Sequence, residues 1–144
     1  MNVASILKAK GRKVETIKSD AAMVMAVHKL ASLRIGALVV SGDGERVDGI
    51  LAERDVIRGL GKHGARLMDM KVSDVMTKGV PVCSPEDSVI MVMAEMTRSR
   101  NRHLPVVDGG RLCGIISVGD VVKNRLDEMQ LQAEVLRDVY IASR

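Results

Sequence analysis

The chain has 144 residues, 47% of them hydrophobic, which fits one compact domain or two half-domains that share a core. Tyr140 is the only aromatic residue, so the aromatic side chains on which single-stranded nucleic acid stacks are missing. The net charge of +4 is small and is scattered among acidic residues. We therefore expect no nucleic-acid partner.

The cysteines and the lack of long apolar runs bear on the compartment. Cys83 and Cys113 both lie in apolar, strand-like segments, which predicts reduced core thiols. No apolar run approaches the length of a membrane span. The first ten residues lack the apolar stretch of a signal peptide. The sequence predicts a cytoplasmic protein without membrane association.

The first half of the chain predicts a regular alternation of helices and strands. Apolar residues recur at spacings of three and four in its helical segments, and glycines mark the turns. The expected elements are a helix over Val3–Leu7, a strand over Val14–Ile17, a helix over Ala21–Leu33 capped by Ser19 or Asp20, strands over Ala37–Val40 and Val47–Ala52, and a helix over Asp55–Leu60.

The second half predicts the same series again. The expected elements are a helix over Val72–Met76, a strand over Val80–Cys83, a helix opened by Ser84–Asp87, strands over His103–Val107 and Leu112–Ser117, and a final helix from Gly119 or Asp120 into the C-terminus. We predict two units, residues 1–64 and 72–144, joined by a linker over residues 65–71. The long final helix either covers the core or pairs with another subunit, and the sequence leaves both interpretations open.

The two halves repeat one hydrophobic plan. The string Gly49-Ile50-Leu51-Ala52-Glu53-Arg54-Asp55 returns as Gly114-Ile115-Ile116-Ser117-Val118-Gly119-Asp120. A shorter echo pairs Ala37-Leu38-Val39-Val40 with Leu104-Pro105-Val106-Val107. A repeat of this size cannot close a core alone and packs on its copy. Two such copies enclose a cleft, which is a natural small-molecule site.

Taken together, these strings resemble a tandem cystathionine-β-synthase (CBS) domain pair, or Bateman module, of the stand-alone bacterial kind. Supporting strings are Val72-Ser73-Asp74-Val75-Met76-Thr77 and Arg102-His103-Leu104-Pro105-Val106-Val107. The resemblance implies an α+β fold with layered helices and sheets, in which two β-α-β-β-α repeats pack about a pseudo-two-fold axis. It also implies an adenosine-containing ligand (AMP, ADP, ATP, S-adenosylmethionine or NAD(H)), a homodimer of CBS pairs and an unknown regulated protein.

The end of the second repeat is suited to a ribose. The carboxylate of Asp120 can accept hydrogen bonds from two adjacent hydroxyls, and bonds to a charged acceptor are strong. The helix that begins beside it offers free N–H groups to a phosphate. Gly119 gives room, and Ser117 adds a hydroxyl. The alternative is a capping box formed by Ser117 and Asp120 without any ligand.

The first repeat departs from this pattern at two positions. Ala52 stands in place of Ser117, and Arg54 replaces Gly119 with bulk and positive charge, while Asp55 is kept. We expect the Asp55 site to be weaker, to prefer another phosphate arrangement or to stay empty. Helix capping alone is an equally good interpretation of Asp55.

Phosphates need cations, and adenine needs an apolar slot. Arg102 suits bidentate phosphate contact, and His103 contacts phosphate better when it is protonated. For Arg98 and Arg100 we favour exposed charges at a strand edge. The resemblance places the adenine slot along the first strands of the repeats and the start of the second, here Thr16, Ile17, Lys18, Val82, Cys83, Ser84, Ile35, Gly36, Ala37 and Ile115.

Catalysis finds little support in the sequence. The histidines are isolated, no Cys/His spacing suits zinc, and neither a nucleophile elbow nor a phosphate-binding Gly-rich loop occurs. We therefore predict a regulatory module that senses adenosine-containing nucleotides, with no catalytic residue, no catalytic cofactor and no metal. A structural oligomerisation module indifferent to nucleotides is the alternative, and an enzyme acting on NAD(H) or a nucleotide is a third hypothesis.

Overall fold

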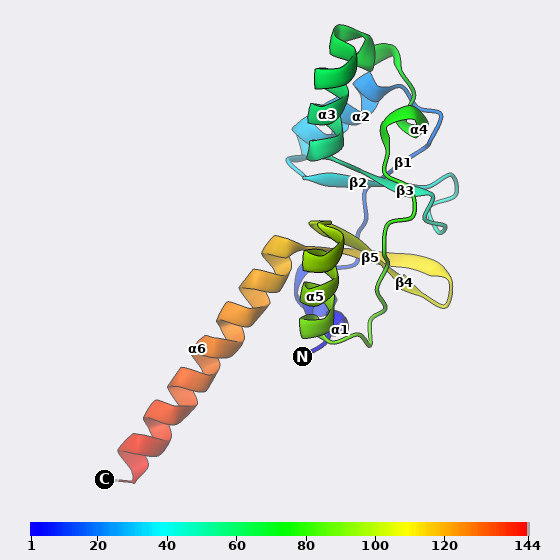
Figure 1. Cartoon of the computed structure of the whole chain (residues 1–144). Coiled ribbons are helices and arrows are strands. Elements are labelled where there is room, and N and C mark those ends of the chain that lie inside the picture. The colour runs from blue at the N-terminus through cyan, green and yellow to red at the C-terminus, as the bar shows by residue number, and fades with distance from the viewer. Residues whose placement is uncertain (144) are drawn as a thin grey trace.

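The computed structural model describes residues 1–143 and has two stacked α/β units with one long helix leaving them (Figure 1). One unit holds a three-stranded sheet and the other a two-stranded sheet. The predicted α+β fold with two repeats is confirmed. The chain passes between the units twice, once after the first helix and once before α5 (Figure 1).

The first unit is built on strands β1 (Thr16–Ile17), β2 (Ala37–Val40) and β3 (Gly49–Ala52). β1 runs parallel to β2, and β2 pairs with β3 in an antiparallel hairpin. Helices α2 (Met23–Leu33) and α3 (Glu53–His63) pack beside this sheet. All four residues of β2 are buried, as expected for the central strand of a sheet.

The second unit repeats this plan with one strand fewer. β4 (His103–Asp108) and β5 (Arg111–Ser117) form the hairpin, and α5 (Val89–Ser99) and α6 (Val118–Ala142) are its helices. The predicted strand over residues 80–83 is wrong, because only Cys83 pairs, in a single parallel bridge to Val106. Pro81 has no N–H to donate to a ladder, and Val82 is 49% exposed.

The repeats exchange their first helices. Val3, Ile6 and Leu7 of α1 (Val3–Lys10) lie in one core cluster with Leu104 and Ile116 of the second unit. Conversely, Val72 of α4 (Val72–Val75) and Leu67 of the 3₁₀ helix η1 (Gly64–Asp69) lie in the core of the first unit. The two packed units are therefore not two consecutive segments of chain.

The hairpins correct the predicted alignment of the repeats by one residue. Ala37 pairs with Ala52, and His103 pairs with Ser117. Because Ala52 and Ser117 are equivalent positions, Ala37 corresponds to His103 and not to Leu104. The same register makes Gly36 equivalent to Arg102, and Arg34 equivalent to Arg100. Arg34 and Arg100 support this register, because they are the only non-glycine residues in the described chain with positive φ, 55° and 58°.

The predicted starts of four helices also need correction, since α5 begins at Val89 after its N-cap Ser88 and α6 begins at Val118, and α2 and α3 differ as well. Neither Ser19 nor Asp20 caps α2, whose N-cap is Ala22 without a side-chain hydrogen bond. The start of α2 is held instead by a backbone bond from Met23 N–H to the carbonyl of Met70 (2.8 Å). α3 begins at Glu53, so Asp55 is its third residue.

Helix α6 has two different parts. Val121 near its start is buried in the core of the second unit. Every residue from Met129 to Ser143 is exposed, and this part of the helix extends away from both units (Figure 1). The interpretation in which the long helix covers the core is therefore wrong.

Candidate functional site

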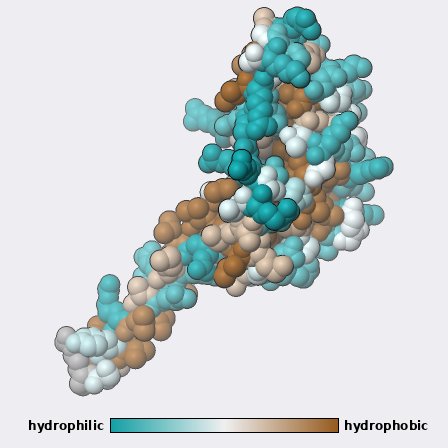
Figure 2. Space-filling model, viewed as in Figure 1, coloured by the Kyte–Doolittle hydropathy of each residue, from teal (hydrophilic) through white to brown (hydrophobic). Residues whose placement is uncertain are grey.

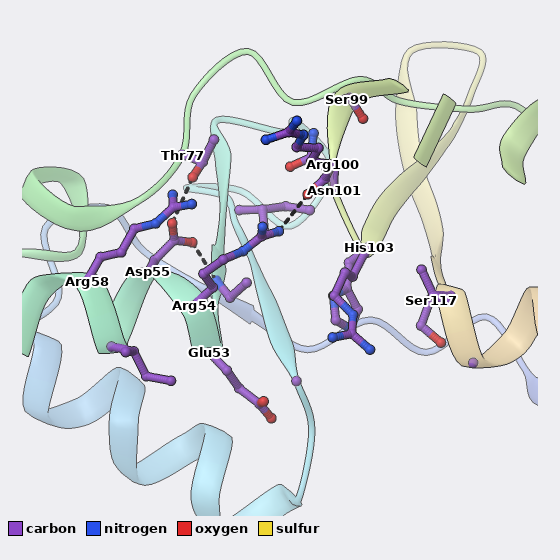
Figure 3. A pocket seen from close by; sticks show the side chains of 17 residues that line it. Glu53, Arg54, Asp55, Arg58, Thr77, Ser99, Arg100, Asn101, His103 and Ser117 are labelled. Atoms are coloured by element: carbon purple, nitrogen blue, oxygen red, sulfur yellow. Dashed lines mark hydrogen bonds between the residues drawn. The ribbon is translucent and has the colours of Figure 1, made fainter. Parts of the chain in front are cut away.

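A cleft of about 850 Å³ lies between the two repeats. It receives the starts of α3 and α6, the end of α5 and the first residue of β4 (Figure 3). Its lining consists of Gly36, Ile50, Ala52, Glu53, Arg54, Asp55, Ile57, Arg58, Thr77, Ser99, Arg100, Asn101, Arg102, His103, Ser117, Val118 and Gly119.

Both helices that open onto the cleft start with the same backbone geometry. The N-cap residues Ala52 and Ser117 have φ −105° and ψ 163° in each repeat. Three residues later a carboxylate accepts the N-cap N–H, from Ala52 to Asp55 (2.8 Å) and from Ser117 to Asp120 (2.9 Å). Only Ser117 returns the bond, accepting the N–H of Asp120 at 3.1 Å. The two helix N-termini direct partial positive charge at one cavity.

The two carboxylates differ in their second partner. Oδ1 of Asp55 accepts the hydroxyl of Thr77 at 2.9 Å, and Asp55 is only 8% exposed. Asp120 instead binds Lys10, whose Nζ lies 2.7 Å from Oδ2 and also donates to the carbonyl of Ile115 at 2.9 Å. Within residues 1–143, Oδ1 of Asp120 has no hydrogen-bond donor, and the side chain is 23% exposed. Asp120 thus keeps one oxygen available.

Lys10 and the capping bond also set the ionisation of Asp120. Partial burial alone raises the pKa of this carboxyl, but the hydrogen bonds from Lys10 and from the N–H of Ser117 more than offset it. The net effect is a pKa below the usual value of 3.8. Asp120 is therefore a charged acceptor at neutral pH.

Four arginines surround the larger cleft. Arg54 and Arg58 come from one face of α3, whereas Arg100 and Arg102 come from the segment between α5 and β4 (Figure 3). Arg54 bridges the repeats, since its Nη2 donates to the carbonyl of Arg100 at 2.6 Å. Glu53 and Asp55 are the acidic residues in the lining, and Asp55 is already hydrogen bonded to Thr77. The cleft is therefore suited to a ligand with several negative charges.

His103 lines both cavities and lies close to Gly36. Its Cε1 and Nε2 are 3.1 Å from the position that a Cβ on Gly36 would occupy, so a side chain at residue 36 would crowd the ring. Burial lowers the pKa of His103 below 6.5, although the nearby carboxylate of Glu53 opposes this shift. The imidazole is therefore neutral at pH 7, where it offers one donor and one acceptor.

A second pocket, of about 270 Å³, adjoins the cleft and is lined by residues of both repeats. It shares Gly36, His103 and Ser117 with the larger cavity. Ile35, Ala37 and Ile115 give it an apolar wall, and Lys10, Lys13 and Glu15 form its polar side. A flat apolar group held here would lie next to Ser117, three residues before Asp120.

The structure brings together most of the predicted site residues. Those that line one or both cavities are Ala52, Arg54, Asp55, Arg102, His103, Ser117, Gly119, Gly36, Ile35, Ala37 and Ile115. Asp120 is not in the lining of either cavity, but it accepts hydrogen bonds from Lys10 and from the N–H of the lining residue Ser117. Six others, Thr16, Ile17, Lys18, Val82, Cys83 and Ser84, line neither cavity. Cys83 is 6% exposed, and burial is the main cause that raises its pKa to about 12, so it is an inert core thiol.

Sequence reasoning missed several residues of the cleft. Arg58, Thr77, Asn101 and Ser99 line it, and so does Arg100, which was expected to be a simple surface charge. Arg58 follows Arg54 by four residues on α3, and this helical spacing was a usable signal. For Thr77 the sequence held no signal, because its contact with Asp55 depends on the exchange of α4 between the repeats.

Two α/β repeats that exchange their first helices and enclose a common polar cleft define a tandem-repeat α/β module. The sequence profile of the CBS domain matches residues 6–62 and 72–127. The chain belongs to the CBS-domain family and holds a pair of its domains. No helix within residues 1–143 has the length and apolar character needed to span a membrane.

Solved structures agree with this assignment. The CBS-domain protein ATU1752 from Agrobacterium tumefaciens is 41% identical, with a TM-score of 0.84 over 87% of this chain and 99% of that one. A putative signal-transduction protein with CBS domains from Burkholderia ambifaria is 39% identical, with a TM-score of 0.82 over 88% and 95%. The CBS domain pair of MJ0100, solved with 5′-methylthioadenosine and S-adenosyl-L-methionine, shares the fold at 21% identity, with a TM-score of 0.78 over 89% and 98%.

Among curated proteins, the mitochondrial CBS domain-containing protein CBSX3 of Arabidopsis thaliana is 33% identical over 129 residues, or 84% of this chain. This chain covers 63% of the length of that protein. An uncharacterised 17.7 kDa protein of Acidianus ambivalens is 31% identical over 83% of this chain and 72% of its own length.

Proposed function

We propose that this CBS pair is a regulatory module that binds an adenosine-containing nucleotide across the two joined cavities. The observation that carries the proposal is the meeting of four arginines and two helix N-termini at one cleft, with the lining residue Ser117 bonded to the carboxylate of Asp120, one oxygen of which has no donor within residues 1–143. Few ligands other than a nucleotide combine a diol, an apolar ring and several negative charges. The complex of the related MJ0100 domain pair with two adenosine compounds supports the same ligand class.

In this proposal each part of the ligand has its own partners. The adenine occupies the smaller pocket, against the apolar wall of Ile35, Ala37 and Ile115. The ribose hydroxyls donate to Oδ1 of Asp120, since one carboxylate oxygen has two lone pairs to offer. The phosphates extend into the larger cleft toward Arg102 and Arg54 and the helix N-termini.

Regulation follows if the ligand prefers one arrangement of the repeats. The arginines come from both repeats, and Arg54 already links α3 to the carbonyl of Arg100. A polyphosphate that binds these side chains at once favours the arrangement that brings them together. That shift in population is the signal that a regulated partner would read.

Isothermal titration calorimetry of adenosine, AMP, ADP, ATP and NADH tests this proposal directly. Affinity should increase with the number of phosphates. Arg102→Met should weaken the binding of ATP by about 10-fold or more while changing the binding of adenosine little. Arg98→Met is the matched control, because Arg98 pairs with Glu95 on α5 and lies outside the cleft. Absence of heat with every compound at millimolar concentration would refute the proposal.

An enzymatic function is distinguished by following the bound nucleotide. Among residues 1–143 no group of three or more His, Cys, Asp or Glu side chains is arranged to hold a metal ion. Apart from the arginines and the hydrogen-bonded Asp55, the titratable side chains in the lining of the larger cleft are Glu53 and His103. Under the proposal, the nucleotide is recovered unchanged by chromatography after long incubation, and its conversion would favour an enzyme.

A further inference from the structure

The exposed part of α6 carries a continuous apolar stripe. Figure 2 shows hydrophobic residues along the projecting helix. Within this stripe, residues recur alternately at spacings of four and three over about three heptads: Val122, Leu126, Met129, Ala133, Leu136 and Tyr140. The five large members are 48–69% exposed. This spacing is typical of the seam of a coiled coil.

Four of the six stripe residues, from Met129 onward, lie beyond the part of the chain that matches the CBS profile. The CBS profile ends at residue 127, and the similarity to ATU1752 covers 87% of this chain but 99% of that one. The helix has 25 residues, so it is about 37 Å long. Helical segments with no packed face are marginal in water. A partner for this face would bury the exposed side chains of Leu126, Met129 and Leu136.

We propose that the partner is α6 of a second copy of this chain, in a parallel two-stranded coiled coil. The helix has five acidic and three basic side chains, so its net negative charge disfavours an anionic membrane surface or a nucleic acid. Two copies of one helix bring identical heptads together, and the seam residues then meet their own equivalents in layers. Ala133 is the only small residue in those layers.

Charge beside the seam selects the parallel direction. In an antiparallel pair with matched layers, Lys123 of one copy lies next to Arg137 of the other, and like charges repel. In the parallel pair, Arg137 meets Gln132 and Arg125 meets Gln130 of the second copy, so no like charges face each other. Arg125 is also paired with Glu128 on its own helix, at 2.7 Å.

The area is sufficient for a small specific interface. Complete burial of a large aliphatic side chain removes about 60–120 Å² of apolar surface. Because the five large seam residues are about half exposed or more, two helices bury on the order of 600 Å² from these side chains alone. The flanking stems of Lys123, Arg125, Gln130 and Arg137 bring the total toward the roughly 1,200 Å² of a small stable interface.

A matched pair of leucines tests the seam. Leu136 lies in the seam and Leu131 outside it, and they are 69% and 59% exposed. By sedimentation equilibrium, the wild-type chain should have twice its mass of 15.6 kDa. Leu136→Glu should raise the dimer Kd about 100-fold, because two carboxylates enter the seam, whereas Leu131→Glu should leave it within about 3-fold. A monomeric wild type, a trimer, or equal effects of the two variants would overturn the proposal.

Cysteine crosslinking tests the direction and separates this interface from any contact between the globular units. Ala133→Cys should form a disulfide-linked dimer on mild oxidation, since parallel helices place residue 133 beside its own copy. Leu131→Cys is the control, and both variants carry the same native Cys83 and Cys113. Adding Leu136→Glu should abolish the crosslink at 133. A dimer that crosslinks no better at 133 than at 131 would overturn the proposal.

Discussion

The two repeats place a carboxylate at the same point of the fold and use it differently. Asp55 is buried and has both oxygens occupied by its own chain, by the N–H of Ala52 and the hydroxyl of Thr77. Asp120 accepts both of its hydrogen bonds, from Lys10 and from the N–H of Ser117, through one oxygen, Oδ2. Duplication of a unit thus supplies two sets of helix starts, of which one has both carboxylate oxygens bonded and the other has one oxygen without a donor within residues 1–143.

The two repeats also differ in how the exchanged segments cover one equivalent glycine in each hairpin. Gly49 and Gly114 are equivalent, and each is covered by the helix segment that the other repeat contributes. A Cβ at Gly49 would lie 2.7 Å from the backbone carbonyl of Thr77, whereas a Cβ at Gly114 would lie 2.6 Å from the end of the Leu7 side chain. Leu7 can change rotamer, but the carbonyl of Thr77 cannot move without its strand bridge to Ile50.

The largest expected effect is therefore a difference in stability between variants of these two glycines. Gly49→Ala should destabilise the protein by about 3 kcal/mol, and Gly114→Ala by about 1 kcal/mol, because overpacking against backbone is harder to relieve than overpacking against a flexible side chain. Urea denaturation followed by circular dichroism measures both. Equal losses would show that the two exchanged helices are equally rigid, against the contrast drawn between them.

The second prediction compares variants of Asp55 and Asp120 in both stability and ligand binding. Asp55→Ala should cost about 2–3 kcal/mol, because it leaves the half-buried hydroxyl of Thr77 and the N–H of Ala52 without an acceptor. Asp120→Ala should cost only about 1 kcal/mol, since its ion pair with Lys10 is partly exposed. Binding should show the reverse order: Asp120→Ala weakens AMP at least about 10-fold, and folded Asp55→Ala binds nearly as well as wild type.

A control isolates the capping contribution. Asp74→Ala removes an exposed carboxylate that accepts the N–H of Lys71 at 3.1 Å at the start of α4, so it reports the cost of a lost capping bond alone. Unchanged AMP affinity in Asp120→Ala would show that the ribose does not bind this residue. Loss of AMP binding by Asp55→Ala at a temperature where the variant is folded would mean that the first repeat holds the ligand.

A smaller effect is expected from exchanging the N-cap residues. Ser117→Ala removes the bond to the N–H of Asp120 and should cost about 0.5–1 kcal/mol. Ala52→Ser adds the same hydroxyl on an identical backbone and should stabilise by about 0.5 kcal/mol. Thermal unfolding monitored by circular dichroism measures both. A destabilised Ala52→Ser variant would show that the first repeat is too crowded around Thr77 to accept a hydroxyl.

The sequence was enough to predict the repeats, their order and the position of each site carboxylate. The bounds of β2 agree residue for residue with the prediction, because a short apolar run between a glycine and a turn leaves little freedom. The partners of the carboxylates were not predictable. Thr77 and Lys10 lie 22 and 110 residues from Asp55 and Asp120, and their contacts exist only because α1 and α4 pack on the opposite repeat.

No pattern in the sequence predicts that α1 and α4 pack on the opposite repeat. α1 and α4 are eight and four residues long, and a short apolar helix shows no preference for the sheet of its own repeat. The strand predicted over residues 80–83 does not form because Pro81 has no N–H to donate, although the apolar character of this run favoured a strand. The register error at Ala37 arose because Leu104-Pro105 resembles the strand sequence more closely than His103 does.

The smallest expected effect concerns pH, and again only one repeat shows it. His103 is titratable, whereas its equivalent Ala37 is not. Because burial lowers the folded pKa of His103 below 6.5, the unfolded chain binds a proton more readily than the folded one. Stability should therefore fall as the pH drops from 7 through about 6.5, and the loss should level off once the pH is below the folded pKa.

His103→Gln should remove this slope, because glutamine keeps a donor and an acceptor without titrating. Free energies of unfolding measured between pH 5 and 7.5 give the slope, and His28→Gln, at an exposed position of α2, serves as the control. A ligand whose phosphates lie beside His103 should flatten the wild-type slope, because a negative charge favours the imidazolium in the folded state. A slope that persists in His103→Gln would assign the pH dependence to another group, and a slope unaffected by saturating ATP would place the phosphates away from His103.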